Sequence, residues 1–147
     1  MLQNSCMGRW LTVAFVMVGA VLGATLPAPA ADTARTVVAG GSVTEIVYAI
    51  GADEHLVAVD STSQYPPAAA EVPNVGYLRQ LSAEPMLAMD PTLLLADHDA
   101  GPPATLEQLS VAGVEVIVVP AAKSVDAVIE KIRFVAGCST GPRPVSS

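Results

Sequence analysis

The chain has 147 residues, with 14 acidic and seven basic side chains and a formal net charge of −7 at neutral pH. Because it is acidic and has no basic cluster, we expect neither nucleic acid nor an anionic membrane surface as a partner. Its apolar fraction of 52% is too high for a disordered chain, and its length suits one modest domain.

The first thirty residues have the pattern of a secretory signal peptide. A weakly positive start with Arg9 precedes an apolar run from Trp10 to Leu22, and small residues and prolines follow up to Ala30. A membrane anchor is the less favoured alternative, because the run is shorter than the about 20 residues that span a bilayer. We therefore predict a signal peptide over residues 1–30 and an exported mature chain without a membrane span.

The first half of the mature chain alternates short apolar runs, which are typical of strands, with helix patterns. We predict strands at 36–39 and 56–59, a helix over 42–50, a loop over 60–74 and an extended segment over 75–79. Ser42 is expected to cap the first helix, with Glu45 completing a capping box, and Gly51 is expected to end it. Ser82 is expected to cap a short helix after the extended segment.

The second half repeats this alternation. We predict strands at 92–96 and 114–119, a helix between Gly101 and Gly113, and a last helix from Ser124 to about Phe134. One face of the last helix is apolar and consists of Val125, Val128, Ile129 and Ile132. Strands alternating with helices at this spacing predict an α/β fold, with an open and mainly parallel sheet flanked by helices.

Ligands of such sheets bind outside the carboxyl ends of the strands. This rule predicts four cleft-facing places: the Gly40–Gly41–Ser42 turn, the loop that starts at Asp60, the Tyr77–Arg79 segment and the Asp97–Gly101 loop. Gly41 and Ser42 begin a helix, where free amides can hold an anion, although a tight turn alone also explains them. The glycine pattern of dinucleotide-binding folds does not occur.

Tyr77 and Arg79 are two residues apart in a segment that we expect to be extended, so both side chains should lie on one face. A guanidinium beside a phenol stabilises the phenolate, which is the form that binds ferric iron. The alternative is that Tyr77 packs on the sheet edge and Arg79 pairs with a surface carboxylate. Chemistry alone leaves both interpretations open.

His98 lies between Asp97 and Asp99, which are residue types that can surround a metal ion. One histidine does not make a metal site, so a solvated loop is the favoured interpretation. No Ser-His-Asp or Cys-His grouping has a known signature, and we therefore expect no enzymatic activity.

Four blocks of the sequence resemble the periplasmic haem-binding proteins of ABC importers. They are the stretches GGSVTEIVYAIG at 40–51, VDSTSQYPP at 59–67, VGYLRQLSAE at 75–84 and AGPP at 100–103. The first block also fits cobalamin and siderophore binders, whereas the third is more specific to haem. The resemblance covers about residues 35–134.

The resemblance implies two α/β lobes joined by a rigid helix, with the ligand held between them. It implies that Tyr77, as its phenolate, ligates the iron of ferric haem, and that Arg79 stabilises this charge or a haem propionate. Gly41 and Ser42 are the further candidates for contact with the haem. The implied partners are haem, as the transported ligand, and an inner-membrane ABC permease.

Residues 137–147 depart from the family pattern, because glycines and prolines end the helical periodicity there. We therefore expect an N-terminal lobe at 31–136, an aberrant and disordered tail at 137–147 that contains Cys138, and no second lobe. The predicted function is binding of ferric haem for import by a truncated receptor. The alternatives are a corrinoid or ferric-siderophore receptor of the same class, and a degenerate fragment or interaction module without a ligand.

Overall fold

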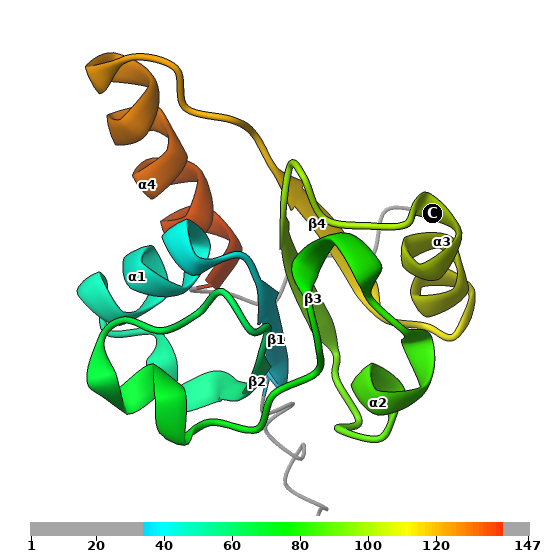
Figure 1. Cartoon of the computed structure of the whole chain (residues 1–147). Coiled ribbons are helices and arrows are strands. Elements are labelled where there is room, and N and C mark those ends of the chain that lie inside the picture. Colours follow the sequence, from blue (N-terminus) through cyan, green and yellow to red (C-terminus); the bar gives the residue numbers. More distant parts are fainter. Residues whose placement is uncertain (1–33, 140–147) are drawn as a thin grey trace, which may run out of the picture. The chain divides into compact units, whose positions relative to one another are not determined.

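A computed structural model describes residues 34–139 of the chain. The predicted signal peptide and most of the predicted tail lie outside these residues. Four strands form one parallel sheet in the order β2-β1-β3-β4 (Figure 1). Their bounds are β1 Thr36–Ala39, β2 Leu56–Val59, β3 Leu93–Asp97 and β4 Glu115–Val119. The predicted α/β fold with an open parallel sheet is confirmed.

Helices cover both faces of the sheet. On one face lie α1 (Gly41–Ala49) and α4 (Val125–Ser139), which contact each other; on the other lie α2 (Ala83–Leu87) and α3 (Pro103–Val111) (Figure 1). Single 3₁₀ turns occur in the connections at Asp53–His55, Pro67–Glu71 and Leu78–Gln80. Every strand connection therefore crosses one face of the sheet, as parallel pairing requires.

The central strands β1 and β3 are buried on both faces, which explains their continuous apolar sequences. Val37 and Leu94 belong to the core cluster under α2 and α3, whereas Val38 and Leu95 belong to the cluster under α1 and α4. Adjacent residues thus point to opposite faces with the period of two that is expected for strands.

The start of α1 differs from the expected capping box. The helix begins at Gly41, its N-cap residue is Gly40 with a φ of 131°, and no side chain caps it. A Cβ atom at Gly40 would lie 2.6 Å from the Cβ of Asp97, so only glycine fits between the two strand ends. Ser42 is therefore the second residue of the helix rather than its cap, and its hydroxyl donates to Asp97.

The last helix is longer than predicted. Ser124 accepts a hydrogen bond from the amide of Ala127, as a helix cap should, but α4 continues to Ser139. Val135 and Cys138 are buried in the core cluster beside α1, so their packing offsets the cost of Gly137 in the helix, about 1 kcal/mol. The predicted end near Phe134 and the predicted change at residue 137 are therefore wrong for 137–139; residues 140–147 lie outside the described chain.

The apolar stripe of α4 does not face the core. Its side chains are 38–79% exposed, whereas the side of α4 that is buried carries Lys131, Val135 and Cys138. The stripe consists of Val125, Val128, Ile129 and Ile132. None of the helices within residues 34–139 is long and apolar enough to span a bilayer.

The close approach at Gly40 gives a direct test of this geometry. We expect Gly40→Ala to lower the free energy of unfolding by about 3 kcal/mol, because it adds both a left-handed backbone cost and a clash. Gly51→Ala is the matched control, since Gly51 has a φ of 70° but open space around it. It should cost only about 1 kcal/mol in urea denaturation. Equal losses in the two variants would contradict the close approach.

Candidate functional site

The order of the strands creates a topological switch point at the carboxyl edge of the sheet. β1 and β3 are neighbours, but the chain leaves β1 toward α1 on one face and leaves β3 toward α3 on the other. Ligands of open α/β sheets bind at such a switch point. Here the Ser42 hydroxyl donates a 2.7 Å hydrogen bond across it to Oδ2 of Asp97. Two of the four predicted cleft-facing places, the Gly40–Gly41–Ser42 turn and the Asp97–Gly101 loop, are therefore in contact.

Asp60 links the loop after β2, which is the second predicted place, to the Gly40–Gly41–Ser42 turn. Its carboxylate is fully buried and accepts hydrogen bonds from the amide of Gly40 at 2.9 Å and from the hydroxyl of Ser63 at 2.8 Å. The Thr62 hydroxyl donates to Asp60 and accepts from the amide of Gly41. The glycine amides are thus used within the fold, which matches the tight-turn interpretation of this segment.

A buried ion pair joins the end of β3 to α4. The ammonium of Lys131 lies 2.9 Å from Oδ2 of Asp97 and 2.8 Å from the Ser42 hydroxyl, and both charged residues are under 10% exposed. Burial raises the pKa of Asp97, but hydrogen bonds from Lys131, Ser42 and His98 outweigh it and lower the pKa to about 2. Sequence reasoning missed Lys131. Its spacing of four and seven residues before Val135 and Cys138 is the pattern that places it on their buried face.

The loop after β3 carries His98 between two carboxylates. Its Nδ1 contacts the Asp97 carboxylate and its Nε2 lies 3.3 Å from Oδ1 of Asp99. Within residues 34–139, no three His, Cys, Asp or Glu side chains are grouped so that they can hold a metal ion. The loop is a polar network in which both ring nitrogens have carboxylate partners.

The Tyr77–Arg79 segment is held against this loop. The Gly101 amide donates to the Leu78 carbonyl at 2.9 Å, and the Leu81 amide donates to the Gly101 carbonyl at 2.8 Å. Residues 78–80 form a 3₁₀ turn, so the prediction of an extended segment through Arg79 is wrong and the same-face argument for the pair does not hold. The turn is closed by a 2.8 Å hydrogen bond from the Gln80 amide to the Tyr77 carbonyl, and the two bonds with Gly101 hold it on both sides.

The two side chains of that segment have different surroundings. The Arg79 guanidinium pairs with Oδ2 of Asp99, as the surface-carboxylate alternative predicted for Arg79. Tyr77 is 44% exposed, and within residues 34–139 its hydroxyl has no hydrogen-bond partner. The structure therefore leaves one phenol oxygen open to a ligand at the carboxyl edge. We call the part of the carboxyl edge formed by residues 77–79 and 97–101 the rim.

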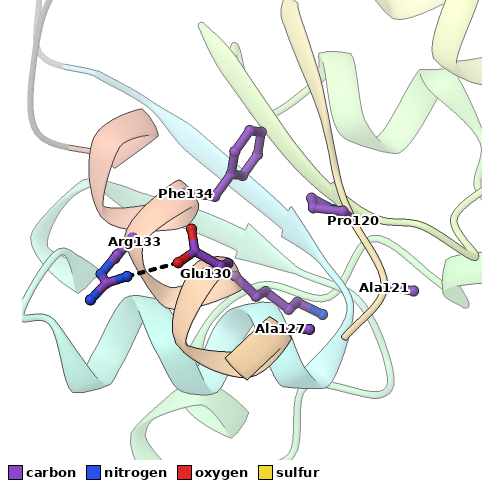
Figure 2. Close-up of a pocket in the computed structure, with 7 residues that line it drawn as sticks. Pro120, Ala121, Ala127, Glu130, Arg133 and Phe134 are labelled. Atoms are coloured by element: carbon purple, nitrogen blue, oxygen red, sulfur yellow. Dashed lines mark hydrogen bonds and ion pairs between the residues drawn. The ribbon is translucent and has the colours of Figure 1, made fainter. Parts of the chain in front are cut away.

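A cavity of about 490 Å³ lies elsewhere, between the end of β4 and α4 (Figure 2). Figure 2 shows the ion pair of Glu130 and Arg133 at this cavity, with Phe134 projecting from the same helix. None of Tyr77, Arg79, Gly41 and Ser42 lines it. The rim is thus separate from this cavity, and its Tyr77 side chain lies at the surface of the protein.

Comparison with protein families identifies the fold. A family model described as periplasmic binding protein matches residues 37–139. The chain belongs to the periplasmic binding protein family. The matched range includes the switch point, both residues of the Asp97–Lys131 pair and the whole of α4.

Individual members of the periplasmic binding protein family are also similar. A haem-binding protein from Roseiflexus sp. RS-1 (RhuT, apo form) is 45% identical, with a TM-score of 0.67 over 71% of this chain and 41% of its own. A periplasmic haem-binding protein from Pseudomonas aeruginosa is 42% identical, with a TM-score of 0.68 over 71% and 37%. A vitamin B12-binding protein of Yersinia pestis (strain Pestoides F) is 37% identical over 92 residues, which are 63% of this chain and 32% of that protein. The chain thus spans about a third to two fifths of the length of these relatives.

The buried ion pair of this periplasmic binding protein predicts a large effect of removing one partner. Lys131→Met should lower the free energy of unfolding by about 3 kcal/mol, because it leaves the Asp97 carboxylate buried without its cation. Lys123→Met, at an exposed lysine just before α4, is the control and should change stability by less than about 0.5 kcal/mol. Urea denaturation measures both. A small loss in Lys131→Met would show that the pair does not stabilise the fold.

The low pKa of Asp97 predicts an acid-dependent loss of stability. The folded pKa is about 2 against an ordinary 3.8, so the carboxylate contributes stability above about pH 4 that is lost as the pH falls toward 2. The wild-type chain should therefore lose about 1–2 kcal/mol more than Asp97→Asn between about pH 5 and about pH 2. Parallel losses in urea denaturation at the two pH values would contradict this assignment.

Proposed function

We propose that this chain is a ligand-binding lobe of a substrate-binding protein of an ABC importer, that its ligand is ferric haem, and that the Tyr77 phenolate ligates the haem iron. The observation that carries the proposal is the phenol of Tyr77, which is half exposed at the carboxyl edge and has no hydrogen-bond partner within the described chain. Phenolate oxygen is a known protein ligand of haem iron.

The exposure of Tyr77 leaves room for a large ligand. Tyr77 is 44% exposed and does not line the β4–α4 cavity, so a porphyrin can approach it from the surface of the lobe. The 3₁₀ turn after Tyr77 is fixed by its two backbone bonds with Gly101, which limits the movement of the phenol. A tyrosine side chain that is already held in place loses less conformational entropy when it coordinates the iron.

The other predicted site residues have supporting parts in this proposal. Arg79, on the same turn, provides a guanidinium that can form paired hydrogen bonds with a haem propionate. Gly41 and Ser42 have their amide and hydroxyl groups engaged by Thr62 and Asp97, so they shape the rim and position β1 against β3. We propose contact with the haem for Tyr77 and Arg79 only.

The similarity to haem binders of known structure supports the choice of ligand. The two haem-binding structures are 42% and 45% identical to this chain, and both superimpose on 71% of it. The proposal therefore extends to their setting: a periplasmic receptor, without enzymatic activity, that delivers haem to an inner-membrane permease.

A corrinoid is the second candidate ligand. The vitamin B12-binding relative is 37% identical to this chain over 92 residues. Cobalamin coordinates its own metal without a protein phenolate, so the two candidates differ in their dependence on Tyr77.

Binding of hemin to the full chain tests the proposal. The wild-type chain should give the visible absorption spectrum of high-spin ferric haem with a tyrosinate ligand. Tyr77→Phe should lose this spectrum and bind hemin on the order of tenfold more weakly or worse, because the iron loses its oxygen ligand. Tyr65→Phe is the matched control, since Tyr65 is a 64% exposed tyrosine outside the rim turn, and it should behave as the wild type.

Two outcomes would count against haem. An unchanged hemin spectrum in Tyr77→Phe would remove the iron ligand from the proposal. Saturable binding of cyanocobalamin, together with no saturable binding of hemin, would favour the corrinoid instead.

A further inference from the structure

We propose that Asp99 limits the affinity of the rim for ligands that carry a carboxylate, because it occupies Arg79 until such a ligand displaces it. This inference rests on the proposed function and names a specificity-determining residue for it. It concerns the acid groups of the ligand rather than its metal.

The ion pair of Arg79 and Asp99 is exposed, so Arg79 can exchange Asp99 for another carboxylate. The guanidinium Nη2 contacts Oδ2 of Asp99, and the two side chains are 59% and 43% exposed. Exposed ion pairs contribute little to stability, since water solvates both partners well when they separate. A ligand carboxylate can therefore replace Asp99 on the guanidinium at small cost, and the number of ion pairs is conserved in the exchange.

Asp99 stays in place when Arg79 turns to a ligand, because its loop is held at both ends. Its loop begins at Asp97, which the buried ammonium of Lys131 holds, and ends at Gly101, which is bonded on both sides to the tyrosine turn. The second carboxylate oxygen of Asp99 lies 3.3 Å from Nε2 of His98. When a ligand takes the guanidinium, Asp99 stays on its loop beside His98.

A lower affinity for acids, and for acids alone, follows from this competition. A ligand with a free carboxylate gains the guanidinium but must displace Asp99, so the wild-type affinity is lower than the guanidinium alone would give. A ligand without a carboxylate has nothing to exchange, so it gains nothing from Arg79 and leaves the pair intact. Neutralising Asp99 should thus strengthen binding of the acid alone.

Iron-free protoporphyrin IX and its dimethyl ester are the probes, because neither can coordinate Tyr77 through a metal. Fluorescence titration of the full chain should show that Asp99→Asn binds the diacid about two- to fivefold more tightly than the wild type does. The same variant should bind the dimethyl ester with unchanged affinity. Asp99→Glu keeps the competing charge and should behave as the wild type.

Two controls separate competition from a general change in charge. Glu130→Gln removes one carboxylate from another exposed ion pair, that with Arg133, and should leave both affinities unchanged. In an Arg79→Gln background, Asp99→Asn should no longer strengthen binding of the diacid, because the guanidinium for which the carboxylates compete is gone.

The inference is overturned if Asp99→Asn changes the diacid and the ester alike, if it leaves both unchanged, or if it acts equally in the Arg79→Gln background. Failure of the proposed function has a different signature. In that case Tyr77→Phe leaves the hemin spectrum unchanged, while the ratio of diacid to ester affinity still responds to Asp99. A wild-type chain that binds neither porphyrin would overturn both.

Discussion

The buried ion pair between Asp97 and Lys131 is the contact on which the rim depends. It brings a cation from the last helix to the end of a central strand, where burial alone would disfavour the carboxylate charge. Ser42 adds a hydrogen bond from the first helix to the same oxygen. One charged oxygen therefore joins two helices and a strand at the point where a parallel sheet of this order opens. Without the lysine, the strand end would have to bury an unpaired charge.

The rest of the site is built outward from this pair by hydrogen bonds between loops. Asp60 fixes the first glycine turn to the loop after β2, and Gly101 fixes the loop after β3 to the turn that carries Tyr77. The inner positions are buried, and their polar groups are satisfied by partners within the fold. The outer positions, Tyr77 and Arg79, are exposed. This division separates the residues that hold the rim from those that are available to a ligand.

Local sequence patterns predicted the strands and the segments that lie at the carboxyl edge of the sheet. They did not predict the contacts between those segments. The runs at 36–39 and 56–59 are apolar segments that end before a glycine or an aspartate, so local pattern alone set their limits. Lys131 was missed because its partner is 34 residues earlier, and because the more apolar stripe of α4 suggested a different buried face. Ser42 was misassigned as the cap because the helix begins one residue earlier, where Gly40 packs against Asp97 on the neighbouring strand. The turn at 78–80 likewise depends on Gly101, which is distant in sequence.

The two hydrogen bonds of Gly101 also have a mechanical consequence. Its amide and its carbonyl are bonded to opposite ends of the tyrosine turn, so the turn and the loop after β3 form a single stiff unit. This unit is connected to the middle of α4 as well, because the loop after β3 begins at Asp97, which pairs with Lys131.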